Sequence, residues 1–182
     1  MKRQHDMPFG ATPTATGGAR FRLWAPGAKR VDLVLPADGS EQAMQALADG
    51  WFETRHERAA PGLRYQYRID GATRVPDPAS RSNPDDVHGT SALTDPQGFD
   101  WPDAAWRGRP WHEAVVYELH VGCFTPAGSF LAAIERLDDL VALGVTAIEL
   151  MPVADFPGGR GWGYDGVLLY APESSYGSPD VL

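Results

Sequence analysis

The sequence is poor in cysteine, in basic residues and in long apolar runs, and each shortage excludes a class of protein. Its 182 residues include one cysteine, Cys123, so an internal disulfide cannot form and a disulfide-stapled scaffold is excluded. Acidic residues outnumber basic ones by 24 to 16, and the net charge of −8 disfavours contact with a phosphate backbone. We therefore expect no nucleic-acid partner, whereas neutral ligands remain open.

Long hydrophobic stretches are also missing. No run of about 18 consecutive apolar residues occurs, so the sequence predicts no membrane-spanning helix and no membrane partner. The basic residues 1–3 are followed by polar residues 4–6, where a signal peptide would need an apolar run. With no export signal in view, we expect a cytoplasmic protein, and the sequence gives no indication of its oligomeric state.

Glycine and proline are frequent instead, with 20 and 16 residues, which favours loops and β-structure over a helical bundle. Apolar and polar residues alternate along short segments near residues 20–25, 31–35, 51–54 and 65–69, as expected of β-strands with one buried face. Such strands must bury their apolar faces against a second sheet. Residues 1–90 are therefore predicted to form an all-β sandwich of immunoglobulin-like type.

Residues 91–111 are predicted to be a connector, because prolines recur from position 76 to position 102 and prevent long strands. Four aromatic residues in this region are too apolar for a free linker, so we expect them to pack along their neighbours. They are Phe99, Trp101, Trp106 and Trp111.

Residues 112–182 show a different pattern. The β-favouring run 115–121 is typical of a strand covered on both faces, and 145–150 is predicted to be a second strand. Between them, Ser129 is a suitable N-cap and Gly144 a suitable end for one helix. Its expected buried stripe is Phe130, Ile134, Leu137 and Val141. This order predicts a right-handed crossover between parallel strands.

The end of the sequence suggests an unfinished fold. Two parallel strands cannot close a barrel or bury both of their faces. Residues 178–180 (Ser-Pro-Asp) are typical of a helix start, yet only two residues follow. We therefore expect the chain to be part of a longer, truncated fold.

The segment 149–177 is the strongest candidate for a functional site. It follows a predicted strand, it is long, and it is rich in glycine, aromatic residues and carboxylates. Flat rings for stacking on a ligand are offered by Trp162, Tyr164 and Tyr170, and hydrogen-bond acceptors by Asp155, Asp165 and Glu173. The alternative is that the aromatic side chains only pack the loop.

The same segment contains the pattern G-x-G-x-x-G from Gly161 to Gly166. A dinucleotide site needs this pattern directly after a strand and at a helix start. Here 10 residues separate Leu150 from Gly161, and the following residues 167–170 favour a strand. We therefore disfavour a dinucleotide site and expect no organic cofactor.

Two isolated residues, His120 and Cys123, have side chains that can take part in binding or catalysis. His120, after the first strand of this half, would face a site at the strand ends or be a satisfied core histidine, and both readings stay open. Cys123 is predicted to be packed and unreactive. The histidines and this cysteine show no zinc-ligand spacing, so no metal site is predicted.

Three segments resemble a known family. They are residues 117–130 (YELHVGCFTPAGSF), 145–167 (VTAIELMPVADFPGGRGWGYDGV) and 77–89 (DPASRSNPDDVHG). They are similar to the malto-oligosyltrehalose trehalohydrolases of the α-amylase superfamily, and the likeness extends from Arg20 onward. Asp165, after the WGY triplet, favours this family over the branching enzymes, which usually carry another residue there.

The resemblance implies a β-sandwich followed by a (β/α)8 TIM barrel, of which this chain would hold the first β/α units. It implies hydrolysis of the α-1,4 bond beside the terminal trehalose of a malto-oligosyltrehalose, without metal or organic cofactor. The substrate-binding residues it indicates are Tyr164, which would stack on the sugar, and Asp165, which would hold the site's geometry, beside Trp162 and His120. The family's catalytic carboxylates follow later barrel strands, so we assign no catalytic residue and expect the chain alone to be inactive.

Two alternatives remain. The chain belongs to a branching or debranching enzyme of the same superfamily, or it is a non-catalytic module that holds a malto-oligosaccharide on exposed aromatic side chains such as Trp24 and Trp51.

Overall fold

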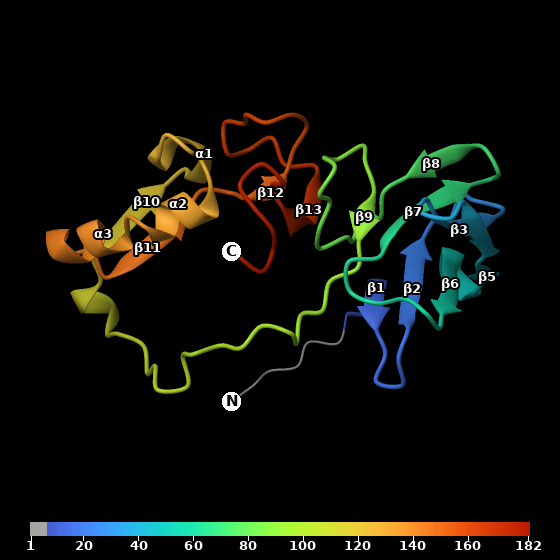
Figure 1. Cartoon of the computed structure of the whole chain (residues 1–182), viewed down its shortest axis with the longest axis horizontal. Coiled ribbons are helices and arrows are strands. Elements are labelled where there is room, and N and C mark those ends of the chain that lie inside the picture. The colour runs from blue at the N-terminus through green and yellow to red at the C-terminus, as the bar shows by residue number, and fades with distance from the viewer. Residues whose placement is uncertain (1–6) are drawn as a thin grey trace.

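The computed structural model describes residues 7–182, so residues 1–6, where no signal peptide is predicted, lie outside the described residues. A group of β-strands lies at one end of the molecule and a smaller part with helices and strands at the other (Figure 1). Residues 97–110 form an extended segment between them that contains neither helix nor strand.

The N-terminal part consists of two antiparallel sheets, which confirms the predicted β-sandwich. The first sheet has the order β1 (Gly10–Pro13), β2 (Ala19–Trp24), β6 (Trp51–His56) and β5 (Gln45–Ala46). The second has the order β4 (Ser40–Ala43), β3 (Val31–Leu35), β7 (Arg64–Ile69) and β8 (Thr73–Val75), with β9 (Ser91–Ala92) beside β7. A short 3-10 turn, η1 (Ala48–Gly50), precedes β6.

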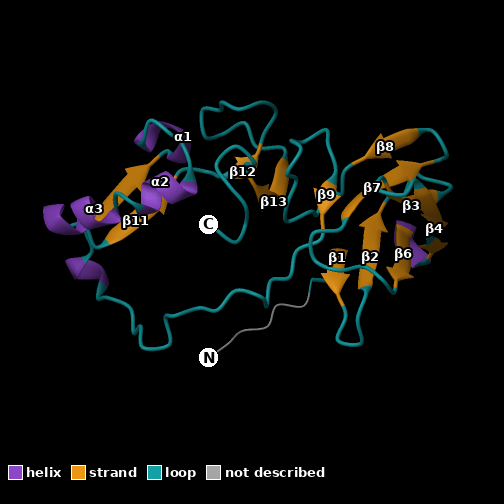
Figure 2. Ribbon diagram, in the orientation of Figure 1, coloured by secondary structure: helices purple, strands orange, loops and turns teal. Residues whose placement is uncertain are grey.

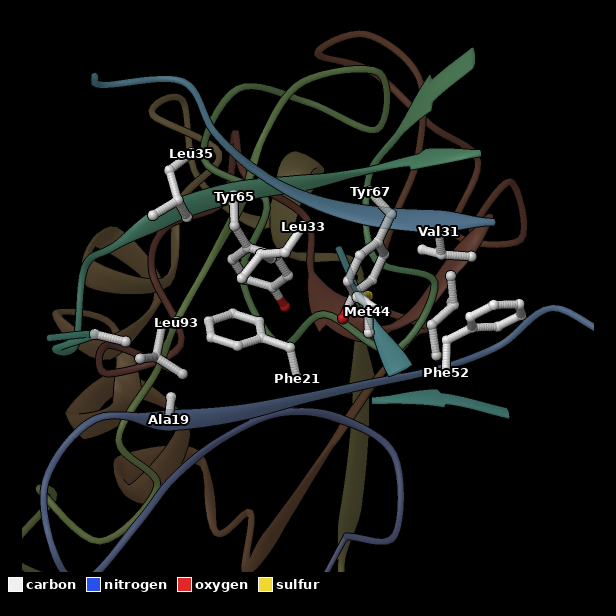
Figure 3. Packing of buried hydrophobic residues seen from close by; sticks show 12 residues of the cluster. Ala19, Phe21, Val31, Leu33, Leu35, Met44, Phe52, Tyr65, Tyr67 and Leu93 are labelled. Carbon is white, nitrogen blue, oxygen red and sulfur yellow. The ribbon is translucent and has the colours of Figure 1, made fainter. Parts of the chain in front are cut away.

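The sandwich core lies between the two sheets (Figure 3). Phe21 on β2 is fully buried, and its ring meets the ring of Tyr65 on β7 edge to face at 4.9 Å. Leu33 on β3 is also fully buried in this cluster. The alternation predicted for these strands is therefore confirmed at its inward positions.

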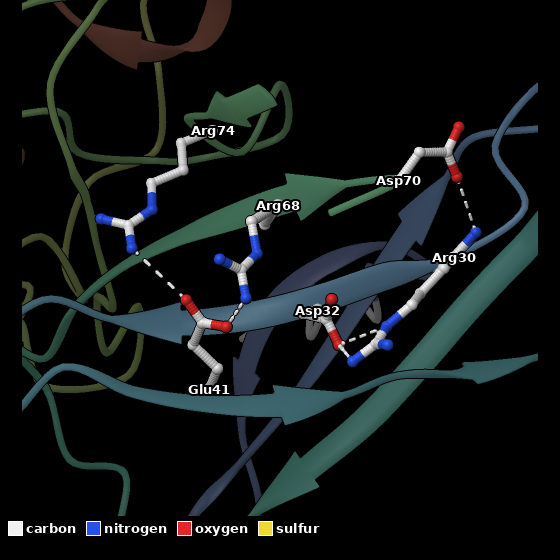
Figure 4. A network of polar contacts seen from close by, with 6 residues as sticks. All are labelled: Arg30, Asp32, Glu41, Arg68, Asp70 and Arg74. Carbon is white, nitrogen blue, oxygen red and sulfur yellow. Dashed lines mark hydrogen bonds and ion pairs between the residues drawn. The ribbon is translucent and has the colours of Figure 1, made fainter. Parts of the chain in front are cut away.

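The outer face of the second sheet carries a network of charges (Figure 4). Glu41 on β4 pairs with Arg68 on β7 and, at 3.3 Å, with Arg74 on β8, so one carboxylate bridges three strands. Asp32 lies on β3 and is buried because the Arg30 guanidinium covers it, with an N···O distance of 2.8 Å. Every residue of β3 is thus buried, including those on the face where the alternation predicts polar contact with water.

Residues 77–93 pack onto the sandwich around Asp77. The Asp77 carboxylate accepts hydrogen bonds from the hydroxyls of Tyr65 at 2.8 Å and Tyr67 at 3.2 Å. Its backbone N–H donates to the Ser91 hydroxyl at 2.9 Å. Burial raises the pKa of the Asp77 carboxyl, which the hydroxyl donors partly offset.

The prediction that the aromatic residues of the connector region pack along their neighbours is wrong. Their exposed fractions are 43% for Phe99, 64% for Trp101, 75% for Trp106 and 83% for Trp111. Phe99 and Trp101 contact one another, with ring centroids 4.9 Å apart. The extended course of residues 97–110 keeps these rings away from both cores within the described part of the chain.

The C-terminal part contains one parallel strand pair with helices between the strands, as predicted. Its elements are η2 (Trp111–Glu113), β10 (Val116–Leu119), α1 (Val121–Phe124), α2 (Phe130–Ile134), α3 (Leu137–Leu143), β11 (Ala147–Leu150), β12 (Ala154–Asp155) and β13 (Leu168–Pro172). Strands β10 and β11 are parallel, whereas β12 and β13 form an antiparallel pair. Figure 2 shows that the α-helices lie beside β10 and β11.

The predicted helix is split in two, although both of its ends are confirmed. The Ser129 hydroxyl accepts from the N–H of Ala132 at 3.3 Å, and Gly144 ends α3 with a φ of 93°. The predicted buried stripe is wrong at Ile134 and Val141, which are 50% and 68% exposed. Phe130 is buried as predicted, whereas Ala133 and Leu140 are buried in place of Ile134 and Val141, because the spacing i, i+3 and i+10 also follows one helical face.

The expected burial of the first strand on both faces is also wrong. Val116 is 44% exposed and Tyr117, on the opposite face, 36%, and only Leu119 of β10 is buried. Within residues 7–182 the sheet has two strands, so no further strand flanks it. Residues 178–182, expected to start a helix, form a turn in which Val181 donates to the Ser178 carbonyl at 3.1 Å.

Candidate functional site

The candidate site is built at the carboxyl ends of β10 and β11. These strands end in register, with Leu119 opposite Leu150, and the N–H of Met151 donates to the Leu119 carbonyl at 2.9 Å. Parallel strands end at the same edge of a sheet, so the segments that follow them start side by side. The segment 151–167 leaves this edge and folds back over it.

Three glycines allow this close return. A side chain at Gly163 would lie 2.9 Å from the Met151 methyl carbon and 3.3 Å from the His120 ring. A Cβ at Gly161 would lie 3.0 Å from the Phe156 ring, and one at Gly166 would lie 2.6 Å from the Ala154 Cβ. Gly163 also has a φ of +92°, a region that other residues rarely adopt. The pattern that resembles a dinucleotide motif is thus explained by backbone packing.

Three of the four predicted substrate-binding residues, Trp162, Tyr164 and Asp165, lie within residues 162–165. Trp162 and Tyr164 are 87% and 73% exposed, so both rings present open faces to solvent. The Asp165 carboxylate accepts from the N–H of Trp162 at 2.7 Å and closes the turn that carries them. This hydrogen bond within the loop fixes the conformation of residues 162–165.

His120 lies beneath this turn. It is half-buried, its Nε2 lies 3.1 Å from the Gly161 carbonyl oxygen, and the Tyr176 hydroxyl lies 3.5 Å from the same nitrogen. Its Nδ1 is buried and has no hydrogen-bond partner among the residues of the described range. His120 thus links the end of β10 to the loop through Nε2, whereas Nδ1 has no hydrogen-bond partner among residues 7–182.

Asp155 and Glu173 are buried, which corrects the expectation that they offer acceptors to a ligand. Their exposed fractions are 0% and 1%. Glu173 accepts from the N–H groups of Phe156 at 3.0 Å and Ser175 at 2.9 Å, and Asp155 accepts from Ser174 at 3.2 Å. Both carboxylates therefore hold the base of the loop together.

Burial at the base of the loop changes the titration of Asp155 and Tyr176. Loss of hydration, with a further contribution from the negative charge of Glu173, raises the pKa of Asp155 to about 6. Burial also raises the pKa of Tyr176, and Glu173 adds to this rise. Asp155 is therefore largely neutral at pH values near 5, where exposed carboxylates are already ionised.

Sequence reasoning missed Tyr176. It is buried, and its ring lies about 6 Å from each of three other rings: 5.9 Å from Phe130, 5.9 Å from Phe156 and 6.0 Å from His120. Its carbonyl accepts from the N–H of Phe130 at 2.8 Å. Tyr176 is the one aromatic residue among the polar and small residues 173–178, six positions after the β-favouring run 167–170, and this was the available signal.

The loop also touches the sandwich side of the molecule. The N–H of Gly158 donates to the Asp86 carboxylate at 2.9 Å, across 72 positions of sequence. Asp86 has a φ of 70°, which is uncommon for a residue other than glycine. A second contact joins Phe9 and Tyr170, whose rings meet edge to face at 5.6 Å.

Three other features of the described residues concern metal ligands, the cysteine and helix length. Within residues 7–182 no group of three or more His, Cys, Asp or Glu side chains is placed to hold a metal ion. Cys123 is exposed, so the prediction that it is packed is wrong. The described helices are all too short to cross a lipid bilayer.

The sandwich belongs to a class of domains, the carbohydrate-binding modules. Residues 8–96 match carbohydrate-binding module 48, the isoamylase N-terminal domain. A pullulanase structure from Anoxybacillus sp. LM18-11, complexed with maltotetraose, aligns with 95% of this chain and 30% of its own at a TM-score of 0.75 and 25% identity. The chain thus shares its fold with part of this pullulanase.

The chain is homologous to the malto-oligosyltrehalose trehalohydrolases, which confirms the resemblance seen in the sequence. It is 47% identical to the Deinococcus radiodurans enzyme, over 98% of this chain and 30% of that protein. A solved structure of a candidate α-amylase from Salmonella typhimurium has 50% identity and a TM-score of 0.93, over 97% of this chain and 30% of its own. A branching enzyme from Ralstonia nicotianae is 36% identical, over 91% of this chain and 24% of that protein. The chain spans about 30% of the length of the trehalohydrolases that it matches.

Proposed function

We propose that the protein carrying this chain is a glycoside hydrolase that releases trehalose from malto-oligosyltrehalose by hydrolysing the adjacent α-1,4 bond. The observation that carries this proposal is 47% identity to a malto-oligosyltrehalose trehalohydrolase over 98% of the chain. The exposed rings of Trp162 and Tyr164 support it, because flat aromatic faces suit the apolar faces of sugar rings.

In this proposal, β10 and β11 are the first two strands of a (β/α)8 barrel. Both carry exposed apolar side chains, Val116 at 44% and Ile148 at 43%, as strands do when further barrel elements are to cover them. The loop over their carboxyl ends then forms one wall of the substrate site. Residues 91–111 serve as the connector from the sandwich, and the protein works in the cytoplasm without metal or organic cofactor.

The roles of the four site residues follow from their positions. Tyr164 stacks on the sugar beside the bond that is cut, and Trp162 widens the same aromatic wall. Asp165 holds their turn through the Trp162 N–H. His120 supports the loop from below through the Gly161 carbonyl and faces the site with its ring.

Residues 1–182 alone are proposed to be inactive. A retaining glycosidase needs two carboxyl groups about 5 Å apart that reach the bond to be cut. Asp155 and Glu173 are the neighbouring carboxyl groups of this loop, and both are buried and bonded to backbone N–H groups. They cannot reach a sugar, so the catalytic pair belongs to other barrel strands.

Product analysis tests the proposal. The protein that carries this chain is incubated with a malto-oligosyltrehalose, and free trehalose is measured over time. We expect trehalose as the main product, with maltose and glucose absent at early times. Products that lack trehalose would overturn the assignment.

A second candidate is a branching enzyme, because one such enzyme is 36% identical to this chain. It predicts new α-1,6 bonds when the same protein is incubated with amylose. A debranching enzyme would instead remove such bonds from pullulan. A purely glucan-binding role would leave both polymers and malto-oligosyltrehalose unchanged.

A further inference from the structure

An aspartate from the sandwich side holds the loop that carries the exposed aromatic rings. The Asp86 carboxylate accepts a hydrogen bond from the N–H of Gly158 at 2.9 Å, although the two residues are 72 positions apart. Gly158 belongs to residues 156–165, which we call the aromatic loop because they carry Trp162 and Tyr164. The contact therefore links the sandwich side of the molecule to the proposed substrate wall.

The turn that presents Asp86 is tied to the sandwich on both sides of this residue. The N–H of Asp86 donates to the Asn83 carbonyl at 3.2 Å, and its carbonyl accepts from the N–H of Gly89 at 2.9 Å. The buried Asn83 side chain accepts from the Ser91 hydroxyl on β9 at 3.0 Å. The Gly89 carbonyl accepts from the side-chain amide of Gln66 on β7 at 3.0 Å. Strands of the second sheet thus fix the position from which Asp86 reaches the aromatic loop.

The backbone of Asp86 has an uncommon conformation, which its surroundings maintain. Its φ of 70° lies in the left-handed region, which costs free energy at a residue other than glycine. The carboxylate also accepts from the N–H of Val87, the next residue. One side chain thus stabilises its own turn and reaches Gly158 at the same time.

Little else holds the middle of the aromatic loop. Within residues 7–182, the bond to Asp86 is the one hydrogen bond made by residues 157–160. Apart from its chain neighbours, no atom lies within 4 Å of a Cβ placed at Gly158. The loop is held on either side of this stretch. The N–H of Phe156 donates to a buried carboxylate at 3.0 Å, and the carbonyl oxygen of Gly161 lies 3.1 Å from a histidine ring nitrogen. Loss of the Asp86 contact should therefore free the stretch between them.

We propose that Asp86 is a positioning residue, which sets the place of the Trp162 and Tyr164 rings by holding the aromatic loop at Gly158. This inference rests on the proposed function, in which these rings contact the sugar. Asp86 acts through the loop and not on the sugar itself. Because the hydrogen bond is exposed, water can replace it at little cost in stability. We therefore expect its loss to change where the loop lies more than how stable the protein is.

The two parts of the molecule stay in contact without this bond. The rings of Phe9 and Tyr170 meet edge to face with centroids 5.6 Å apart, and Phe9 also stacks on Trp51 of β6. None of these three residues belongs to the aromatic loop. Removal of the Asp86 side chain should therefore change the loop without separating the two parts.

The first test measures kcat and KM for malto-oligosyltrehalose in the protein that carries this chain. Asp86→Gly removes the acceptor but suits the φ of 70°, so the turn can keep its shape. We expect KM to rise about 3–10-fold with kcat nearly unchanged, because a freed loop is in the binding-competent place only part of the time. Partial unfolding would instead lower the apparent kcat and leave KM unchanged.

Two control variants separate the hydrogen bond from other effects. Asp86→Asn keeps a side-chain oxygen that can accept from Gly158, and its KM should stay within about twofold of the wild-type value. Asp49→Gly makes the same exchange as Asp86→Gly at another aspartate with positive φ, 57°, in η1, and should change neither constant. Burial, the charge of Glu173 and that of Asp86 raise the pKa of Asp155 to about 6. Assays at about pH 8 therefore keep Asp155 ionised in every variant.

Hydrogen exchange of the same proteins, without substrate, follows the loop itself. In Asp86→Gly, the amides of Gly158 and Trp162 should exchange about tenfold faster than in the wild type, and Asp86→Asn should restore most of the protection. Trp162 lies four positions after the contact and its N–H is bonded to Asp165. Its amide therefore reports on the whole loop and not on the lost bond alone.

The two proposals fail in different ways. A wild-type protein that releases no trehalose overturns the proposed function, and the exchange rates then still decide whether Asp86 holds the loop. Unchanged exchange at Trp162 in Asp86→Gly overturns the positioning role, as does an unchanged KM in a protein that releases trehalose. Equal changes in Asp86→Gly and Asp86→Asn also overturn it, because the hydrogen-bond acceptor would then have no effect.

Discussion

The sandwich and the C-terminal part differ in how completely their strands are covered. In the sandwich, strands of two sheets bury Phe21, Leu33 and Tyr67 to exposed fractions of 0%. In the C-terminal part, Val116 and Ile148 on the parallel strands stay more than 40% exposed. The sequence of a strand thus indicates which of its faces are apolar and suited to burial. The elements that cover these faces must come from elsewhere in the fold.

The largest expected effect is on the free energy of unfolding, when leucine is replaced by alanine in each of the two parts. Leu33→Ala in the sandwich core should lower the free energy of unfolding by about 3–5 kcal/mol, because it leaves a cavity between the sheets. Leu143→Ala in α3, where the residue is 74% exposed, should change it by less than about 0.5 kcal/mol. Urea denaturation measures the loss of unfolding free energy in both variants. Equal losses would show that the difference in burial between Leu33 and Leu143 does not affect stability.

The next effect concerns pH and is specific to the C-terminal part. The pKa of Asp155 is raised from its ordinary value of 3.8 to about 6, so folding favours its neutral form. Its contribution to stability is therefore complete below pH 4 and is lost as the pH rises through 6, by about 1–3 kcal/mol. Hydrogen exchange at the amides of Val167 and Ser174, followed from pH 4 to pH 8 and corrected for intrinsic rates, measures this change.

Asp155→Asn is the matched control, because it keeps an acceptor for the Ser174 N–H and removes the titration. The extra pH dependence at these amides should disappear in this variant. If it persists, another group controls the stability of the loop base.

A smaller effect tests the fold of the loop. Gly163→Ala meets both an unfavourable φ of +92° and the Met151 methyl group, and we expect a loss of about 1–2 kcal/mol. Gly158→Ala has a similar φ of +82° but nothing within 4 Å of the new Cβ, so it isolates the cost of the backbone alone. Thermal unfolding compares the two, and a larger loss at Gly158 would contradict the close packing of the loop on the strand ends.

The smallest effect lies on the outer face of the sandwich. Glu41→Gln removes the charge that Arg68 and Arg74 share, but Glu41 is 24% exposed, so solvent screens the pairs. We expect a loss below about 1 kcal/mol, reduced further at high salt. A loss comparable to that of Leu33→Ala would mean that this network, rather than the core, stabilises the sandwich.

The parts of the fold that depend on neighbouring residues in the sequence were predicted well. Alternation located β2, β3, β6 and β7, and capping located both ends of the helical stretch at Ser129 and Gly144. It missed short strands such as β1 and β9, whose pairing depends on distant partners. It also assigned Ile134 and Val141 wrongly to the buried face of the helices, because two sets of residues with helical spacing were available and only tertiary contacts select one.

The candidate site was predicted only in part. Periodicity located the segment after β11, and the resemblance indicated Trp162, Tyr164 and Asp165 within it. The burial of Asp155 and Glu173 could not be anticipated, because carboxylates in a polar loop are usually solvated. The sequence singled out Trp24 and Trp51 as exposed aromatic residues, but the cavity that they line also needs Phe9 and Tyr170 from opposite ends of the chain, and only the fold brings these together.

The most direct test of the account is the rate of trehalose release by the protein carrying this chain, measured as kcat/KM for malto-oligosyltrehalose. Tyr164→Ala should lower kcat/KM by about 5–150-fold, equivalent to about 1–3 kcal/mol, because a stacking face at the substrate wall is lost. Trp106→Ala, which removes an equally exposed ring from the segment 97–110, should leave it unchanged. Unchanged kinetics in Tyr164→Ala would contradict the assignment of the loop as the substrate wall.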